Sequence, residues 1–461
     1  MDWLPNLRAS PGPKYLAIAT ALIDGIRTGR LRPGDRLPPH RMLAERLGID
    51  LTTVTRAYNE ARRQGLIETG GRRGSFVRDI GAGIPNGLVQ TLQIDTSMNM
   101  PPQPQGDILT DRLRTGWDEL LRSPEAGLRL HYQASAGTGP DRAAAARLLS
   151  GRIPGISDES VVVTSGGQNA LHGIIASSLR PGDVVCAANV TYPGFLSAAH
   201  RAGLRVVPIA TDRHGLDPQA LDEACGRERV SALYVIPTND NPTTSTLDVD
   251  RRKAIADIAA RHGVLVIEDD AYGQLPSISL PPISAFAPER AWYIASVSKI
   301  ISPALRVAFV AAPSVRDAYR LADGIHATTG MAPPLTVALV TRWIEDGSYE
   351  RVIAAVREEA SARQRLAKRF LDPDGYAAHP EGYHLWVRLP DDVRRADVVA
   401  AAARAGLSLV ASDVFAVDGR TCPNAVRVSL GGPRSREMVA QGLGVLDALM
   451  RQAAAPTAAV I

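Results

Sequence analysis

The sequence predicts an α/β protein in which a small helical domain precedes a larger domain built on a mostly parallel sheet. Beyond Gly106, short apolar runs rich in valine and isoleucine alternate with helical stretches. Such near-continuous apolar strands are typical of a parallel sheet covered on both faces. The stretch before Arg78 has a different pattern, with helical periodicity, Gly and Pro turns and two short β-rich runs. We therefore expect two unlike domains in one chain.

The length and composition are those of a globular protein with more than one domain. A chain of 461 residues is too long for one ordinary domain, and 45% apolar with 22% charged residues suits a sizeable core. No run of about 18 apolar residues occurs, so we expect no membrane span, and the N-terminus lacks the apolar region of a signal peptide. The three cysteines are odd in number and widely spaced, which argues against a disulfide framework or a zinc site and favours the cytoplasm.

The charge is unevenly distributed along the chain. The first 78 residues contain 14 lysines and arginines against 7 acidic residues, a balance of +7, whereas the whole chain carries 52 against 48. The remaining residues therefore carry a net −3. A basic front on a mildly acidic body indicates that the front contacts a polyanion.

Three helices are predicted in the basic front. A stripe of apolar residues at helical spacing runs over 13–28, and a connector with a Pro-Gly pair then ends this periodicity. A second short helix fits 39–47, with Gly48 as its C-cap. Asp50 can cap a third helix that extends to about Gln64. The buried faces of the last two helices are expected to carry Leu43, Ala44, Leu47, Val54, Ala57, Tyr58 and Ala61.

The third helix has the composition of a DNA-recognition helix. Its outer faces carry hydroxyl and arginine side chains near its start, and a short helix with a glycine turn precedes it, which is helix-turn-helix patterning. Two short strands over 66–69 and 75–78 then enclose a glycine-rich turn with Arg72 and Arg73. This is a two-stranded wing with a basic tip, placed to touch backbone phosphate or the minor groove. The alternative, that the arginines form a solvated face, fits less well with their clustering in this domain.

Four short motifs mark the first 78 residues: Gly29-x-Leu31-x-Pro33-Gly34-x-x-Leu37-Pro38, Arg41-x-Leu43-Ala44, Thr53-Val54-x-Arg56-Ala57-Tyr58 and Gly65-Leu66. With these motifs the first 78 residues resemble the winged-helix domain of the GntR family. The resemblance implies double-stranded DNA as the partner. The chain departs from the family at Asp50-Leu51, where many relatives have Ser-Arg, so base preference is not carried over. The candidate DNA-binding residues are Arg41, Thr52, Thr53, Thr55, Arg56, Arg72 and Arg73. A Gly- and Pro-rich segment over 79–106 is expected to be a linker.

A lysine in the larger domain follows a predicted buried strand. The apolar run 291–295 is followed by Ser296-Val297-Ser298-Lys299, and Arg306 lies seven residues further on. An amine that forms a Schiff base must be partly unprotonated near neutral pH, which burial and nearby positive charge achieve. Serine hydroxyls and a guanidinium suit a phosphate monoester. The pattern indicates an aldehyde that carries a phosphate, and pyridoxal 5′-phosphate fits, although a surface lysine at a strand end is the commoner arrangement.

Other polar motifs follow the apolar runs, where ligands bind on parallel sheets. The glycines of the stretch 164–171 let backbone N–H groups approach a phosphate at a helix N-terminus. Tyr192 could lay its ring against a planar cofactor, although ordinary packing is the alternative. Asn241 can donate to a phenolate oxygen. Asp269 can hold a pyridine nitrogen protonated, although an exposed loop carboxylate is the alternative.

The order of these motifs resembles the fold-type I pyridoxal phosphate aminotransferases, from about Pro102 to Met450. The resemblance implies a domain over 107–455 with a small C-terminal α+β subdomain from about residue 330. Two departures are Thr244, where the family has glycine, and Asp141-Arg142, where it has Leu-Arg. By this resemblance Lys299 is the Schiff-base lysine, Asp269 pairs with the pyridine nitrogen, Asn241 and Tyr272 hold the ring oxygen, and Tyr192 stacks on the ring. Gly167, Gln168, Ser296 and Arg306 form the phosphate site, Tyr132 reaches the neighbouring subunit's phosphate, and Arg427 binds a substrate carboxylate.

A GntR winged helix joined to an aminotransferase-like body is the layout of the MocR subfamily of bacterial regulators. This resemblance implies a cytoplasmic homodimer in which pyridoxal phosphate or an amino compound acts as the effector and shifts the DNA-binding domains. An active aminotransferase that acts on an amino acid is the alternative, because every catalytic group is present, and the two functions can coexist. A DNA-binding scaffold with an inactive body is a third interpretation, which the complete set of cofactor residues disfavours.

Overall fold

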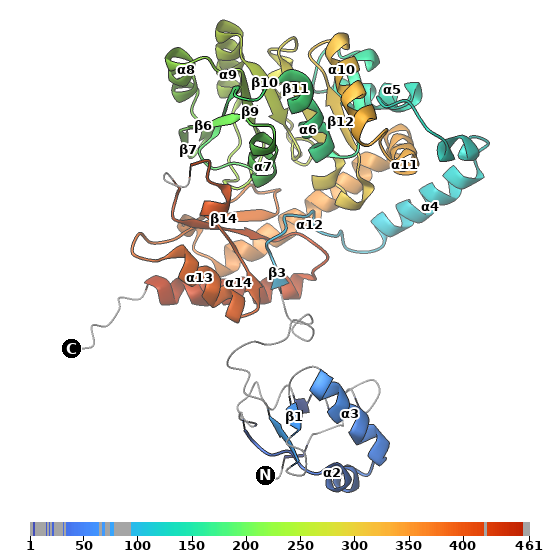
Figure 1. The fold of residues 1–461 in the computed structure, drawn as a ribbon, viewed down its shortest axis with the longest axis vertical. Coiled ribbons are helices and arrows are strands. Elements are labelled where there is room, and N and C mark those ends of the chain that lie inside the picture. Colours follow the sequence, from blue (N-terminus) through green and yellow to red (C-terminus); the bar gives the residue numbers. More distant parts are fainter. Residues whose placement is uncertain are drawn as a thin grey trace. The chain divides into compact units, whose positions relative to one another are not determined.

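The chain folds into two compact units, Met1–Gln93 and Ile94–Ile461. The computed structural model describes residues 3–4, 15, 18, 21–22, 31, 34–63, 67–69, 74–77, 94–418 and 422–454 (Figure 1). The second unit begins inside the segment expected as a linker over 79–106. There, β3 (Ile94–Asp95) pairs in parallel with β15 (Leu407–Ser408), so the second half of that segment packs as part of the larger unit.

The helices of the small unit begin and end at the predicted capping residues. Helix α2 (His40–Leu47) ends at Gly48, which has a left-handed φ of 61° and donates its N–H to the carbonyls of the last turn. Helix α3 (Leu51–Arg63) follows, and Asp50 Oδ1 accepts the backbone N–H of Thr52 at 2.7 Å. Both predicted caps are therefore confirmed. In the first predicted helix, the described residues Tyr15, Ile18, Ala21 and Leu22 are helical.

A single apolar core holds the small unit together. Strands β1 (Ile67–Thr69) and β2 (Ser75–Val77) pair antiparallel with Ile67 opposite Val77, as predicted for a wing. Arg72 and Arg73 of the predicted wing tip lie outside the described residues. The core combines the inner faces of the helices with the strands and contains Ile18, Leu22, Leu31, Leu37, Leu43, Ala44, Val54, Ala57, Tyr58, Ala61, Ile67 and Val77.

The larger unit is built on a seven-stranded sheet in the order β4-β12-β11-β10-β9-β5-β6. Strand β12 runs antiparallel to both of its neighbours and the other pairs are parallel, so the predicted mostly parallel sheet is confirmed. A small hairpin of β7 (Thr211–Asp212) and β8 (Gly215–Leu216) stands beside it. The sheet strands are β4 (Val161–Thr164), β5 (Val184–Ala188), β6 (Arg205–Ile209), β9 (Ala232–Val235), β10 (Leu265–Asp269), β11 (Ala291–Ser296) and β12 (Ala308–Ala311).

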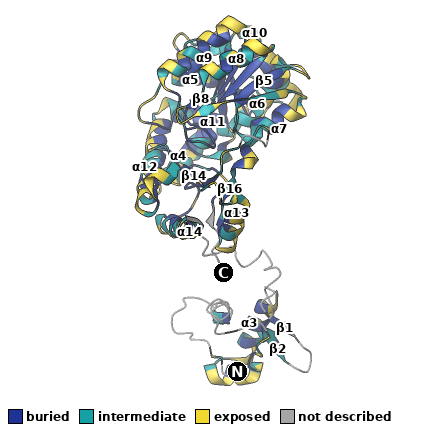
Figure 2. Cartoon of the chain, turned by 90° about the vertical axis from the view of Figure 1, so that its left-hand side faces the viewer, coloured by how far each residue is buried: buried dark blue, intermediate teal, exposed yellow. Residues whose placement is uncertain are grey.

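Helices cover both faces of this sheet because successive strand residues point to opposite sides. Val185 and Ala187 of β5 pack in one core, while Val184 and Cys186 pack in another. Figure 2 shows the buried strands and the exposed outer faces of the surrounding helices. The first core includes α5 (Gly139–Ser150), α6 (Gly167–Ser178), α7 (Pro193–Arg201), α10 (Val315–Thr328) and α11 (Pro334–Glu345), and the second includes α8 (Pro218–Arg227) and α9 (Val249–His262).

A smaller antiparallel sheet forms the C-terminal part of the larger unit. Its strand order is β13-β14-β17-β16, and the long helix α12 (Ser348–Phe370) leads into it. Leu443 and Leu446 of its last helix pack on Val426 and Val428 of the sheet. The elements are β13 (Tyr376–Ala377), β14 (His384–Arg388), α13 (Arg395–Arg404), β16 (Val410–Ala411), β17 (Ala425–Ser429) and α14 (Arg436–Ala454).

An N-terminal helical segment leads from β3 into the main sheet. It consists of α4 (Ile108–Arg122) and the 3₁₀ turn η3 (Ala126–Leu130), and α5 follows. Across the described ranges, no helix has the length and apolar character that crossing a membrane requires.

Candidate functional site

Lys299 lies just beyond the carboxyl end of β11, in the 3₁₀ turn η6 (Val297–Lys299). Its Nζ donates to the main-chain carbonyl of Asn99 at 2.6 Å. Burial lowers the pKa of this amine to about 8, and the positive charge of Arg427 acts in the same direction. The unprotonated fraction of this amine near neutral pH is therefore much larger than that of an exposed lysine, and the unprotonated form is the one that attacks an aldehyde.

Asp269 ends the neighbouring strand β10, where it pairs in register with Ile294 of β11. Its Oδ2 accepts the hydroxyl proton of Tyr234 at 2.8 Å. Burial raises the pKa of the Asp269 carboxyl to about 6, while the Tyr234 hydrogen bond opposes that rise. The Asp269 carboxyl is thus mostly ionised at neutral pH, but it takes up a proton more readily than an exposed aspartate. This suits a group that shares a proton with a pyridine nitrogen.

The adjacent carboxylate has a different environment. Asp270 Oδ2 accepts from Arg152 Nη2 at 2.6 Å and from the Tyr293 hydroxyl at 3.0 Å. These partners are buried, with Arg152 8% exposed. Asp270 therefore belongs to a buried ion pair, and Asp269 is the carboxylate that shares its surroundings with Lys299.

The two residues predicted to hold a ring oxygen contact different parts of the chain. The hydroxyl oxygen of Tyr272 accepts from Asn99 Nδ2 at 2.8 Å. Asn241 follows β9, and its Oδ1 accepts from Arg427 Nη1 at 2.8 Å. That bond leaves the amide N–H groups of Asn241 available to donate to a ligand oxygen.

The predicted phosphate residues meet at the N-terminus of α6. Gly166, just before the helix, has a φ of +83°, and a Cβ there would lie 3.0 Å from Arg306 Nη2. Arg306 Nη2 donates to the carbonyl of Ser165 at 2.9 Å. A Cβ on Gly167 would lie 3.6 Å from Ser296 Oγ. The helix N-terminus, a hydroxyl and a guanidinium therefore converge here, and glycine at position 166 allows the close approach of Arg306.

Tyr192 and Gln168 are brought together beside this group. Gln168 Nε2 donates to the Tyr192 hydroxyl at 3.1 Å, and Tyr192 precedes the first turn of α7. Burial and the negative charge of Asp269 raise the pKa of the Tyr192 phenol. A Cβ on Gly194 would overlap the Tyr192 ring at 2.4 Å, so that glycine permits the position of the ring.

Arg427 lies in the middle of β17, and its side chain is 6% exposed. Besides the bond to Asn241, its Nη2 donates to the main-chain carbonyl of Ser97, and its guanidinium lies 5.1 Å from the centre of the Phe415 ring. Its Nε has no hydrogen-bond partner in the described part of the chain. Burial lowers the pKa of Arg427. A buried cation held by neutral acceptors is a suitable receptor for a carboxylate.

One predicted residue stays apart from this group, and three others were not predicted. Tyr132 is 91% exposed, on the chain that follows η3. The sequence did not point to Asn99, Tyr234 or His384. Asn99 contacts Lys299, Tyr234 contacts Asp269, and His384 contacts Asn99. Asn99 lies in a proline-rich stretch that resembled a linker, and Tyr234 lies within an apolar strand, so neither had a local signal of its role.

The two departures from the aminotransferase pattern have local structural roles. Thr244 has a left-handed φ of 65° and is 6% exposed, so a β-branched residue occupies the conformation that glycine adopts freely. Asp141 caps α5 together with Thr138 and pairs with Arg129 at 3.1 Å. Neither departure removes a group that lies among Lys299, Asp269 and Arg427.

The residues present fit pyridoxal phosphate. An amine with a lowered pKa, a carboxyl with a raised pKa, and a cup of glycine backbone, serine and arginine match its aldehyde, ring nitrogen and phosphate. The Ser298 Oγ is buried without a hydrogen-bond partner among the described residues, as expected of a hydroxyl that a ligand completes. Pyridoxal phosphate bound here would supply an electron-withdrawing ring on which an amino compound can be held or converted.

The predicted DNA-binding residues of the small unit are arranged along α2 and the first turns of α3. Arg41, Thr52 and Arg56 are exposed, whereas Thr53 and Thr55 are half-buried. Thr55 Oγ1 and His40 Nδ1 are 3.4 Å apart. The Arg56 guanidinium lies 4.5 Å from the centre of the Tyr15 ring, which orients it without neutralising it.

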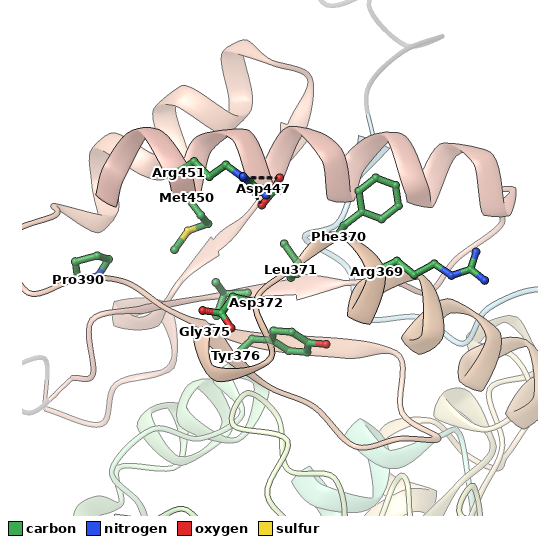
Figure 3. A pocket seen from close by; sticks show the side chains of 11 residues that line it. Arg369, Phe370, Leu371, Asp372, Gly375, Tyr376, Pro390, Asp447, Met450 and Arg451 are labelled. Atoms are coloured by element: carbon green, nitrogen blue, oxygen red, sulfur yellow. Dashed lines mark hydrogen bonds and ion pairs between the residues drawn. The ribbon is translucent and has the colours of Figure 1, made fainter. Parts of the chain in front are cut away.

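A separate cavity of about 480 Å³ lies in the C-terminal part of the larger unit. Figure 3 shows it between the end of α12 and the end of α14, where Asp447 and Arg451 form an ion pair. Its lining is mainly apolar and includes Phe370, Leu371, Tyr376, Val387, Pro390 and Met450. None of the predicted cofactor residues lines it.

Two protein families match successive parts of the chain. Residues 14–77 match the bacterial regulatory proteins of the gntR family. Residues 95–444 match the class I and II aminotransferases, so the larger unit belongs to that family, which implies pyridoxal 5′-phosphate as the cofactor. The gntR match implies DNA as a partner.

Two transcriptional regulators match this chain over nearly its whole length. The helix-turn-helix transcriptional regulator YdeF of Bacillus subtilis is 30% identical over 98% of this chain and 97% of its own length. PtsJ of Salmonella typhimurium, a transcriptional repressor of vitamin B6 salvage, is 28% identical over 94% of this chain and 99% of its own. The α-aminoadipate aminotransferase LysN of Thermus thermophilus, solved with N-(5′-phosphopyridoxyl)-L-leucine, superposes with a TM-score of 0.70 at 26% identity. It covers 79% of this chain and 93% of LysN. The chain joins a winged helix-turn-helix to an aminotransferase body, and it matches the regulator YdeF over nearly its full length. It therefore belongs to the MocR type of GntR transcriptional regulators.

Proposed function

We propose that the protein regulates transcription by binding promoter DNA through its small unit, in response to an amino compound held on pyridoxal phosphate in its larger unit. The observation that carries this proposal is the group formed by Lys299, Asp269 and Arg427 in a chain that also has a GntR winged helix. An amine, a proton-sharing carboxyl and a carboxylate receptor are the three groups that recognition of an amino acid requires.

In this proposal each predicted residue has one task. Lys299 holds the cofactor covalently, Asp269 pairs with its ring nitrogen, and Tyr192 stacks on its ring. Asn241 and Tyr272 donate to the ring oxygen. The phosphate lies at the N-terminus of α6, where it contacts Gly167, Gln168, Ser296 and Arg306.

The proposed effector is a compound with both an amine and a carboxylate. Arg427 supports this choice, because its buried guanidinium is held by the carbonyl oxygens of Ser97 and Asn241 rather than by a carboxylate. An effector carboxylate would supply the opposite charge at a position where burial makes the interaction strong. A simple amine would gain nothing from Arg427.

On the DNA side, Arg41 and Arg56 are proposed to contact mainly phosphates, and Thr52, Thr53 and Thr55 to lie against the duplex. Arg72 and Arg73 of the wing tip are proposed to touch an adjacent phosphate or the minor groove. The site of action is then the bacterial cytoplasm.

We also propose that the protein acts as a homodimer. Four large side chains over 121–132 support this: Leu121 is 62% exposed, Leu128 64%, Leu130 74% and Tyr132 91%. A row of exposed apolar side chains on one segment is typical of a protein interface. Tyr132 would then reach the phosphate bound by the second copy of the chain.

Transamination is a second candidate function. The observation that favours it is the lowered pKa of Lys299, because an amine that titrates near pH 8 can carry protons to and from a bound amino acid. This activity can coexist with regulation.

The experiment that tests the proposal uses the full-length protein loaded with pyridoxal phosphate and a duplex from its own upstream region. Amino acids and the amines that lack their carboxylates are titrated in parallel, while visible absorbance and fluorescence anisotropy of the DNA are followed. An effector changes both signals at the same concentration. A compound that is converted to its keto acid while DNA affinity stays constant would instead identify an enzyme.

A further inference from the structure

The segment Thr96–Met100, which we call the strap, runs between the smaller sheet and the cofactor residues. Its two ends are fastened to the region of β17: the Thr96 carbonyl accepts from the N–H of Ser429 at 3.2 Å, and the Met100 carbonyl accepts from that of Gly432 at 3.1 Å. The Thr96 hydroxyl also donates to the Ser408 carbonyl next to β3. The strap is therefore anchored at both ends in the smaller sheet.

The centre of the strap contacts two cations of the site, Lys299 and Arg427. The Asn99 carbonyl accepts from Lys299 Nζ at 2.6 Å, and the Ser97 carbonyl accepts from Arg427 Nη2. The first of these groups is the proposed attachment point of the cofactor, and the second is the proposed receptor for the effector carboxylate. The carbonyls of Ser97 and Asn99, two positions apart in the strap, thus use the donors that the two ligands need.

The side chain of Asn99 fastens the centre of the strap. Its Nδ2 donates to the Tyr272 hydroxyl at 2.8 Å and lies 3.2 Å from His384 Nδ1. Its Oδ1 accepts from Ser429 Oγ at 3.1 Å. Asn99 is 4% exposed, so these bonds form away from water, where they are strongest.

The state of His384 agrees with this arrangement. Its Nε2 lies 3.0 Å from the Asp240 carbonyl and donates to it, which leaves Nδ1 to accept from Asn99. Burial and the charge of Arg427 lower the pKa of His384 to about 3, so the ring is neutral at physiological pH. The Asn99 amide therefore has a defined orientation, with its N–H groups toward Tyr272 and His384.

We propose that the strap is the element through which occupancy of the cofactor site is transmitted to the DNA-binding unit. Condensation of the Lys299 amine with the aldehyde of the cofactor would release water and replace the amine that donates to the Asn99 carbonyl by an imine with at most one N–H, and a carboxylate on Arg427 would compete with the Ser97 carbonyl for Nη2. Each ligand therefore weakens one of the two contacts that hold the centre of the strap. Because the strap continues directly into β3, a shift of its centre reaches the chain that leads to the small unit through Thr96 and the pairing of β3 with β15.

The step from the strap to DNA binding rests on the proposed function. The displacement of the strap by ligands is independent of it. Asn99→Ala removes the side-chain fastening and leaves every cofactor ligand in place, so it mimics release of the strap. Gln103→Ala is the matched control, since Gln103 is exposed and lies just beyond the strap. Ser429→Ala removes the bond to Asn99 Oδ1 together with the acceptor of the Gly431 N–H, keeps the other bonds of Asn99, and serves as a milder second variant if Asn99→Ala fails to fold.

The first measurement is hydrogen–deuterium exchange of the peptide that covers 94–103, with and without pyridoxal phosphate. Loading of the wild-type protein is expected to speed exchange in this peptide, and Asn99→Ala is expected to exchange at the loaded rate before any cofactor is added. Asn99→Ala should also react with pyridoxal phosphate about tenfold faster, the factor that corresponds to one or two lost hydrogen bonds. Exchange that is the same in loaded and unloaded wild type, or an Asn99→Ala protein that reacts no faster than Gln103→Ala, would overturn the proposal.

The second measurement is the affinity of the same full-length proteins for a duplex from the protein's own upstream region. The wild type should change its affinity on loading, while unloaded Asn99→Ala should already have the loaded value. If Asn99→Ala follows the wild type in both conditions although its strap exchanges fast, the transmission step is wrong. If the wild type does not bind the duplex at all, the proposed function fails instead, and the exchange result still decides whether the strap moves.

Discussion

Arg427 Nη1 donates to Asn241 Oδ1 over 2.8 Å, so a side chain from the smaller sheet meets the loop that follows a strand of the larger sheet. The bond joins residues that are 186 positions apart in the sequence. It places the proposed carboxylate receptor beside the proposed ring-oxygen ligand. A ligand that spans these two residues would therefore bridge the two sheets.

Arg427→Ala should leave cofactor binding intact and weaken the response to amino acids. Two charge-assisted hydrogen bonds to the carboxylate are lost, each worth about 1.5–3 kcal/mol, so the affinity should fall at least about a hundredfold. Titration of the visible absorbance measures this. The amine without the carboxylate is the control ligand, and its affinity should be the same in both proteins. An unchanged affinity for the active amino acid would show that Arg427 is not its receptor.

The reaction of Lys299 with pyridoxal phosphate should follow a pKa of about 8. Below that pH the amine is protonated and unreactive, so the rate of appearance of the visible band should rise with pH and level off above about 9. A free lysine derivative, whose amine titrates near 10.4, should still be gaining rate at that point. Borohydride reduction should abolish the visible band of the wild-type protein and leave the pyridoxyl group covalently attached to Lys299. Lys299→Ala should show neither this band nor this attachment.

Two substitutions should move this pH profile in opposite directions. Arg427→Met removes a positive charge that lowers the pKa of Lys299, so the midpoint should shift to higher pH. Asp269→Asn removes a negative charge that raises it, so the midpoint should shift to lower pH. A shift of both variants in the same direction would contradict the charge arrangement described above.

The neighbouring carboxylates Asp269 and Asp270 should differ in their effects on stability. Asp270→Ala leaves the buried Arg152 without its ion partner and should lower the free energy of unfolding by about 3–5 kcal/mol. Asp269 has a pKa of about 6 in the folded protein, above the value of 3.8 for an isolated side chain. The folded state therefore binds the proton more tightly, and this contribution to stability is lost as pH rises from about 4 to 6.

Above that range the ionised Asp269 destabilises the protein that lacks cofactor. Asp269→Asn should therefore unfold at an equal or higher urea concentration than the wild type at pH 8, although it binds pyridoxal phosphate more weakly. Urea unfolding of Asp270→Ala and Asp269→Asn beside the wild type measures the change in stability of each variant. A large loss of stability in Asp269→Asn would mean that its carboxylate has a structural ion partner.

Arg56→Ala should weaken DNA binding and flatten its dependence on salt. Each phosphate neutralised contributes about −0.9 to the log–log slope of affinity against salt concentration, so the slope should become less negative by roughly one unit. Arg316→Ala, an exposed arginine of the larger unit, is the control and should leave the slope unchanged. A loss confined to one base pair with an unchanged slope would identify Arg56 as a reader of bases. The visible spectrum should be the same in all three proteins.

Leu130→Asp should dissociate the proposed homodimer. A buried leucine contributes about 1.5–3 kcal/mol, so the dissociation constant should rise at least tenfold, which light scattering after size exclusion measures. Tyr319→Asp changes a side chain that is 70% exposed on α10 and is the control. Cofactor affinity should fall with dissociation, because Tyr132 acts on the second copy of the chain. A wild-type protein that is monomeric would rule out this interface.

The sequence alone determined the fold class of this protein, the order of its domains and several of its elements. Apolar runs and turn residues are local signals, so the strand over the apolar run 291–295 and the caps at Gly48 and Asp50 lie where they were predicted. The motifs after the strands were recognisable for the same reason, since a parallel sheet brings the ends of its strands to one edge. The fold family and the cofactor followed from that order.

Only the tertiary structure decided which distant side chains complete the site. Asn99 meets Tyr272 across 173 positions and Ser429 across 330, and nothing in a proline-rich stretch signals such contacts. Two adjacent aspartates look alike in sequence, yet the peptide after β10 directs Asp269 to Tyr234 and Asp270 to Arg152. Local periodicity specifies strands and helices, whereas the pairing of buried polar groups depends on how those elements pack, because each buried donor and acceptor must find its partner in three dimensions.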